Sequence, residues 1–147
     1  MNITLCGSIA FHDRMLEIKN VLEKMGHNVK LPPSEVKDEN GEMMPVMRYY
    51  ELRKKTSDDD SWIWKRKEEA MRMHFDKVEW SEGVLILNYD KNGIKGYVGA
   101  NTLLEMGLAF HMKKKIFLLN KIPEIGYKEE ILGMGPLVIE GDLRKIG

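Results

Sequence analysis

The chain has 147 residues with 23 basic and 23 acidic side chains, so its formal net charge at neutral pH is zero. That balance excludes a global electrostatic attraction to nucleic acid polymers or anionic membranes. The apolar runs are far shorter than the roughly 20 residues that span a bilayer, and we expect no secretory leader. The lone cysteine, Cys6, excludes an intramolecular disulfide and suits a reducing cytoplasm. We therefore expect one cytoplasmic domain over residues 1–147.

The N-terminal segment predicts a strand, a helix and a second strand. Asn2–Cys6 is a short β-branched run that ends in a Gly-Ser pair, which indicates a strand entering a tight turn. A helical apolar period begins at Asp13 and stops at Gly26. A second short strand is expected over residues 28–31, before two prolines. This order predicts one right-handed βαβ unit.

Residues 34–60 interrupt the alternation of strands and helices, and we expect them to form an insertion or lid above the sheet. Within them, Glu42–Lys55 has a weak helical pattern, and Thr56–Asp60 is an acidic turn. Ser61 is expected to cap a long helix over Trp62–Trp80, whose positive end the Asp58–Asp60 run would complement.

The second half of the chain predicts three more strands. They are the unbroken apolar run Gly83–Leu87, then Lys115–Asn120 and Pro136–Ile139. A helix opens near Asn101, and a short helix is expected within residues 123–132. Five short strands that alternate with helices predict a doubly wound, flavodoxin-like or Rossmann-like α/β fold: a parallel five-stranded sheet with helices on both faces.

The helix that opens near Asn101 carries an unusual carboxylate. Helical spacing predicts a buried stripe of Leu104, Leu108 and His111, and Glu105 sits among these apolar positions. A charge left unpaired in an apolar wall costs several kcal/mol. Glu105 either complements the positive end of the helix, or attacks a sugar carbon as the nucleophile of a retaining glycosidase does. Spacing alone leaves both interpretations open.

Ligands of doubly wound sheets bind beyond the carboxyl ends of the strands, where the strand order reverses. Three loops meet there: residues 7–13, 88–102 and 120–123. Two of them lead into helices, whose free N–H groups attract anions, so together they suit a nucleotide. No Walker loop and no Gly-x-Gly-x-x-Gly motif is present. The candidate binding residues are Gly7, Ser8, Ile9, Phe11, Asp90, Gly99, Asn101 and Thr102, with Phe11 as a stacking wall at the rim of the sheet.

Two further carboxylates are candidates for protonating a departing base. Asp76 precedes the third strand and Asp90 follows it, although a solvated surface role is the alternative for each. His74 and His111 lack the spacing of a metal site, so we expect structural histidines and no metal. Cys6 is expected to be a small buried hydrophobe.

Several of these segments together resemble the nucleoside 2-deoxyribosyltransferase-like superfamily, which includes 2-deoxynucleoside 5-monophosphate N-glycosidases. The matching segments are strand-Gly-Ser-Ile near the start, Phe75-Asp76-Lys77-Val78, Ser81–Leu87 and Asn101–Ala109. The resemblance implies an enzyme without cofactor that breaks the N-glycosidic bond of a small-molecule nucleoside or nucleotide, by hydrolysis or base transfer. It is also typical of members to build the site across a dimer interface, so a homo-oligomer is expected.

The same resemblance assigns roles to individual residues. Glu105 matches the nucleophile that forms a glycosyl-enzyme ester, and Gly7 and Ser8 match the loop that meets the sugar or its 5-phosphate. Asp76 is the nearest match to an acidic residue before the third strand. Many members carry Asp or Ser where Gly99 stands here, and this departure favours hydrolysis over transfer.

Two other functions fit the same pattern. One is a nucleotide-binding sensor that keeps the pocket without turnover, which the glycine at position 99 favours. The other is an NAD-cleaving enzyme of similar sheet topology that also uses a glutamate on a helix. A panel of substrates separates these alternatives.

Overall fold

Five parallel strands form the central sheet of the computed structural model, which describes residues 1–57, 59 and 61–147. Their spatial order is β2-β1-β5-β6-β7. The strands are β1 (Asn2–Cys6), β2 (Asn28–Lys30), β5 (Gly83–Ile86), β6 (Lys115–Leu118) and β7 (Leu137–Val138). Numbered by their appearance in this sheet, the order is 2-1-3-4-5, as in flavodoxin-like folds, with the switch point between β1 and β5. The expected doubly wound α/β fold is confirmed.

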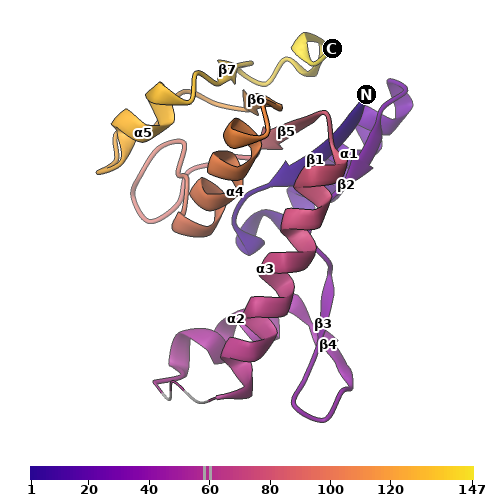
Figure 1. Cartoon of the computed structure of the whole chain (residues 1–147), viewed down its shortest axis with the longest axis vertical. Helices are drawn as coiled ribbons and strands as arrows, with labels where there is room; N and C mark the ends of the chain where they lie inside the picture. The colour runs from indigo at the N-terminus through magenta and orange to yellow at the C-terminus, as the bar shows by residue number, and fades with distance from the viewer. Residues whose placement is uncertain (58, 60) are drawn as a thin grey trace.

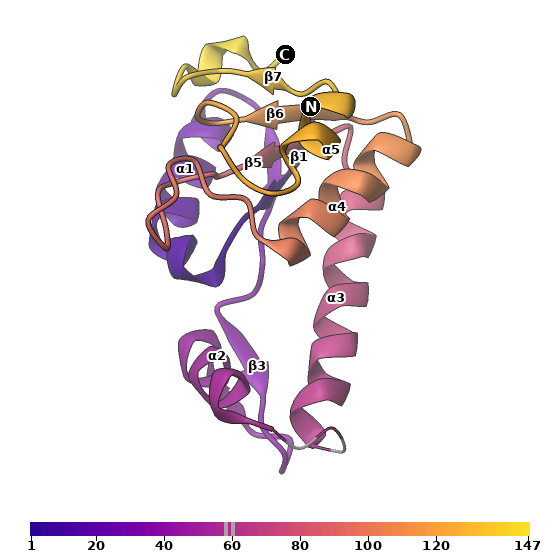
Figure 2. The ribbon, with the colours of Figure 1, turned by 90° about the vertical axis from the view of Figure 1, so that its left-hand side faces the viewer.

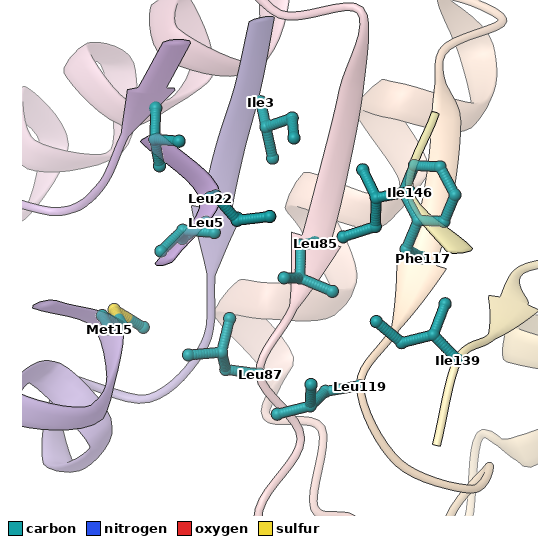
Figure 3. Packing of buried hydrophobic residues seen from close by; sticks show 11 residues of the cluster. Ile3, Leu5, Met15, Leu22, Leu85, Leu87, Phe117, Leu119, Ile139 and Ile146 are labelled. Atoms are coloured by element: carbon teal, nitrogen blue, oxygen red, sulfur yellow. The ribbon is translucent and has the colours of Figure 1, made fainter. Parts of the chain in front are cut away.

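Helices cover both faces of this sheet (Figures 1 and 2). On one face, α1 (His12–Lys24) packs over the side chains of Ile3 and Leu5, and Figure 3 shows this cluster. On the other face lie α3 (Trp62–Trp80), α4 (Ala100–His111) and α5 (Lys128–Gly133). Cys6 faces this second layer, because side chains alternate along a strand. Within the described residues, no helix is long and apolar enough to cross a membrane.

The insertion forms a small lobe of its own, residues 34–57, which we call the insertion lobe. It holds the antiparallel hairpin of β3 (Glu35–Lys37) and β4 (Met43–Pro45), followed by α2 (Val46–Lys55). The lobe packs on the first half of α3, where the Tyr49 hydroxyl donates to the Ile63 carbonyl at 2.7 Å. α3 therefore runs from the lobe to the sheet (Figure 2).

The long helix begins where the sequence predicts. The Ser61 hydroxyl accepts a hydrogen bond from the Ile63 amide at 3.2 Å, as an N-cap should. The expectation that Asp58 and Asp60 complement this helix end lies outside the described residues.

The predicted buried stripe of α4 is wrong at two of its three positions. Leu104 is 52% exposed and His111 is also exposed, whereas Met106 and Ala109 pack against the sheet. α4 lies beside α3 and packs on β5 and β6 of the sheet, so its buried surface is the side that faces these neighbours. That side includes Glu105, which is 3% exposed. Leu104 and His111 therefore lie on the outside of the helix, whereas the half-buried Leu108 packs against the apolar cluster on this face of the sheet.

Candidate active site

Glu105 lies in a buried cluster with a histidine and a cysteine. Its Oε2 is 3.2 Å from Nε2 of His74 on α3, and that nitrogen is 3.5 Å from Sγ of Cys6 at the end of β1. The three side chains are 3%, 6% and 0% exposed, in that order. Among the described residues, Oε2 of Glu105 has no hydrogen-bond partner, because the close approach to His74 lacks hydrogen-bond geometry.

Burial decides the protonation states of this pair. Burial raises the pKa of Glu105 to about 8, although the positive charge of Lys67 acts to lower it. Burial and then the charge of Lys77 lower the pKa of His74 to about 4, with a backbone hydrogen bond of Leu5 acting to raise it. At neutral pH, His74 is therefore uncharged and most Glu105 carboxyl groups are protonated. The contact between them is not an ion pair under those conditions.

Lys67 brings the compensating charge. It is half-buried on α3, where burial and the charge of Arg53 lower its pKa to about 8, while Glu105 acts to raise it. Sequence reasoning missed Lys67 and His74 as parts of the site. A signal was present: with Ile63 and Val78 they form one stripe at spacings of four, seven and four residues, and a polar group on such a stripe faces the interior.

A second polar cluster joins the insertion lobe to the sheet. The Lys91 ammonium, in the loop after β5, donates to the Ser8 hydroxyl at 2.7 Å and to the Tyr50 hydroxyl at 3.2 Å. Ser8 follows β1 and Tyr50 belongs to α2. Burial acts to raise the pKa of Tyr50, but the ammonium groups of Lys54 and Lys91 lower it overall. The cluster lies at the switch point of the sheet, where its fold type binds ligands.

Two of the predicted glycines allow close packing. A Cβ at Gly7 would lie 3.1 Å from the Leu87 carbonyl oxygen and 3.1 Å from Cε of Met15. At Gly99, which precedes α4, a Cβ would lie 3.3 Å from the ring of Tyr97. The Lys91 ammonium is 5.5 Å from the centre of that same ring, so Gly99 helps to bring the start of α4 close to the polar cluster of Lys91, Ser8 and Tyr50.

The buried side chain of Asn88 holds the loops at the carboxyl ends of β5 and β6 together. Its amide nitrogen donates to the carbonyls of Asn120 and Lys121 at 3.0 and 3.1 Å, and its amide oxygen accepts from the Asn120 backbone at 2.9 Å. Asp90 stabilises the same loop by accepting from the Gly96 amide at 3.0 Å. Asp90 is thus tied to loop structure at this edge.

A cleft of about 1200 Å³ near this edge of the sheet is not lined by Glu105. It lies beside the start of α1 and is lined by Phe11, Arg14 and Asp90, among others. Phe11 is buried with its ring edge-on to Tyr89, at 5.2 Å between centroids. Two predicted residues, Phe11 and Asp90, thus line this cleft, and Glu105 does not. The Glu105 cluster is the candidate active site because of the chemistry of its carboxyl, imidazole and thiol groups, and not because of the size of a cleft.

The other predicted residues divide between the site and the surface. Asn101 and Thr102 lie in the first turn of α4, and the buried Oδ1 of Asn101 has no hydrogen-bond partner in the part of the chain that the structure describes. Ile9 packs against the insertion lobe. Asp76 is exposed and comes two residues after His74, which places it on nearly the opposite side of α3. Asp76 thus faces away from the side of α3 that carries His74.

Comparison with known proteins identifies the fold. No family model matches the chain, and no curated protein matches it. A solved 2-deoxyribosyltransferase from the psychrotolerant bacterium Bacillus psychrosaccharolyticus is similar, with 15% identity, a TM-score of 0.50, and coverage of 80% of this chain and 71% of the other. The chain has the 2-deoxyribosyltransferase fold. The resemblance noted in the sequence is thereby confirmed at the level of the fold.

A second solved structure is also similar. The Clostridium botulinum CMP N-glycosidase BcmB has 18% identity and a TM-score of 0.46. The match covers 94% of this chain and 85% of that enzyme.

The protonation of Glu105 predicts a pH-dependent effect on stability. The pKa of Glu105 is about 8 in the folded protein, against an ordinary value of 4.5. Its contribution to the free energy of unfolding is therefore fully present below about pH 4.5 and is lost as the pH rises through about 8. Glu105→Gln keeps the shape and removes the ionisation. We expect the variant to become more stable than wild type by about 2 kcal/mol or more at high pH.

Urea unfolding at about pH 5 and about pH 9 measures this difference. Glu79→Gln, at an exposed position on α3, is the matched control for the loss of a carboxylate. A stability difference between Glu105→Gln and wild type that is the same at both pH values contradicts the assignment.

Proposed function

We propose that the chain belongs to the nucleoside 2-deoxyribosyltransferase-like superfamily and hydrolyses the N-glycosidic bond of a (deoxy)nucleoside 5′-monophosphate. One observation carries this proposal: Glu105 is buried on α4 with an unpartnered Oε2, within the described residues, in a chain with the 2-deoxyribosyltransferase fold. A buried carboxylate without a structural partner is costly. Use as a nucleophile accounts for that cost.

The proposed reaction has two steps. The Glu105 carboxylate attacks C1′ of the sugar, and the C–N bond breaks as its electron pair leaves with the base, which takes up a proton. A glycosyl ester of Glu105 results. Water then attacks C1′, restores the carboxylate and releases the sugar phosphate. The positive charge of Lys67 favours the ionised carboxylate that the first step requires, and uncharged His74 adds no competing charge.

The cluster around Tyr50 supports a phosphorylated substrate. The ammonium of Lys54 and the guanidinium of Arg53 lie 4.5 and 5.1 Å from the centre of the Tyr50 ring, beside the Lys91 contact with Ser8. None of these three cations forms an ion pair with a carboxylate among the described residues. In a chain of zero net charge, such a local excess suits a phosphate group, which forms charge-assisted hydrogen bonds with Lys, Arg and Ser.

The central prediction concerns release of free base. Incubation with nucleosides, their 5′-monophosphates and NAD, followed by chromatography, should yield base from the monophosphates. Glu105→Gln should lower kcat by about 10³-fold or more, because an amide cannot form the ester. For the wild type, kcat/KM should rise with pH to about 8, as Glu105 ionises.

Glu79→Gln is the control variant and should retain activity. Base release that persists in Glu105→Gln contradicts the proposal. Tight nucleotide binding by the wild type without release of base, even on long incubation, favours the sensor instead.

Lys91 should determine the preference for a phosphate. Lys91→Ala removes a cation that contacts both Ser8 and Tyr50, so KM for a monophosphate should rise by about 10-fold or more, while KM for the matching nucleoside changes little. Steady-state kinetics on both substrates measure this split. The control is Lys65→Ala, which removes an exposed lysine from α3. Equal effects on the two substrates would rule out a phosphate contact.

A second copy of the chain is proposed to cover the outer surface of α4. Leu104 and Phe110 are 52% and 53% exposed on α4, and large exposed apolar side chains are typical of an interface. Sedimentation should show a homodimer or larger species, and Leu104→Glu should shift it toward the monomer. Leu132→Glu, on α5, is the control with similar exposure. A wild-type monomer at concentrations of about 100 μM contradicts this part of the proposal.

A further inference from the structure

Three different metal-binding atoms converge at one buried point of the site. Sγ of Cys6, Nε2 of His74 and an oxygen of Glu105 all lie within 4.8 Å of one another. They come from β1, α3 and α4, so the packing of three elements creates the cluster. Sequence spacing does not indicate it, because the ligands are separated by long stretches of chain.

Two of the three separations between these atoms match a tetrahedral ion. Zinc bonds to sulfur at about 2.3 Å and to nitrogen and oxygen at about 2.0–2.1 Å, so tetrahedral angles set the sulfur–nitrogen separation at about 3.6 Å and the nitrogen–oxygen separation at about 3.3 Å. The corresponding separations here are 3.5 Å between Cys6 and His74, and 3.2 Å between His74 and Glu105. An ion fits these two edges with shifts of only about 0.1 Å.

The donors and their surroundings favour zinc over harder ions. A thiolate with an imidazole and a carboxylate suits Zn²⁺ or Co²⁺, whereas Mg²⁺ and Ca²⁺ require oxygen ligands. Among the described residues, Oε2 of Glu105 has no hydrogen bond that an ion would have to break. The opposing charges are those of Lys67, which acts on Glu105, and Lys77, which acts on His74.

We propose that Cys6, His74 and Glu105 form a binding site for one zinc-class divalent ion, with the fourth position open. The Cys6 thiol and the protonated Glu105 carboxyl group lose their protons to the solvent when the ion binds. A bound ion would coordinate the Glu105 oxygen that attacks the sugar in catalysis, so ion binding and cleavage exclude each other. The binding itself is independent of the proposed function, and only this exclusion rests on it.

Co²⁺ added to the tag-free full-length chain tests the site directly. A thiolate–cobalt charge-transfer band should appear and saturate at one ion per chain, and Zn²⁺ should abolish it. Because Cys6 is the only cysteine, the band reports on this residue without any variant. Calorimetry with Zn²⁺ should give a Kd of about 1 μM or tighter.

Variants locate the ion. Cys6→Ser and His74→Gln should each weaken Zn²⁺ binding by about 100-fold or more, since each loses one of three ligands. His27→Gln is the matched control, because Nδ1 of His27 lies 3.0 Å from the N-terminal amine and forms an alternative place for a metal. It should leave binding unchanged.

Absence of the thiolate band in wild-type protein overturns the inference, whether or not the variants fold. Zn²⁺ binding that survives Cys6→Ser but is lost in His27→Gln also overturns it. These results are independent of the base-release assay. Activity that depends on Glu105 in a protein without the band would leave the proposed function standing and the metal site refuted.

Discussion

Glu105 is an ionisable residue that is only 3% exposed, so the residues around it determine whether its carboxyl group is charged. They include no ion-pair partner at neutral pH, because burial keeps His74 uncharged. The half-buried Lys67 offers only a partial counter-charge. The result is a carboxyl group with a pKa near neutrality, which is where general acid–base and nucleophilic groups work best. The packing of α3 on β1 and on α4 is what enforces this environment.

The length of α3 links the site to the insertion lobe. A helix of 19 residues spans about 28 Å, which is enough to contribute Ile63 to the lobe and His74 to the site. Lys91 makes a second connection, from the loop after β5 to Tyr50 on α2. The lobe is thus fixed to the rest of the fold from two sides. A phosphate bound at Lys91 would meet both the lobe and the sheet.

Much of the fold was predictable because local signals agree with it. The unbroken apolar run at Gly83–Leu87 indicates a central strand of a parallel sheet, and Ser61 marks the start of α3. The buried face of α4 was not predictable, since the exposed Leu104 and Phe110 are as apolar as the buried Met106 and Ala109. Only the position of α3 and the sheet decides between the two sides.

The site itself was predictable in part, for a related reason. Glu105 stands out because a carboxylate is unusual among its apolar neighbours, and the Gly-Ser pair after β1 marks a turn. The roles of His74 and Cys6 depend on contacts between residues 31 and 68 positions apart in the chain, and no local pattern encodes those. Asp76 illustrates the converse, because it matches a family pattern while its helix turns it toward solvent.

The most direct test of the account is to look for the covalent intermediate. Wild-type protein turning over a nucleoside 5′-monophosphate is quenched in acid and digested, and the peptide that contains Glu105 is weighed by mass spectrometry. The account predicts a fraction of this peptide heavier by one esterified sugar phosphate, absent in Glu105→Gln. Release of base with the added mass on another peptide, or on none, would contradict a nucleophilic role for Glu105.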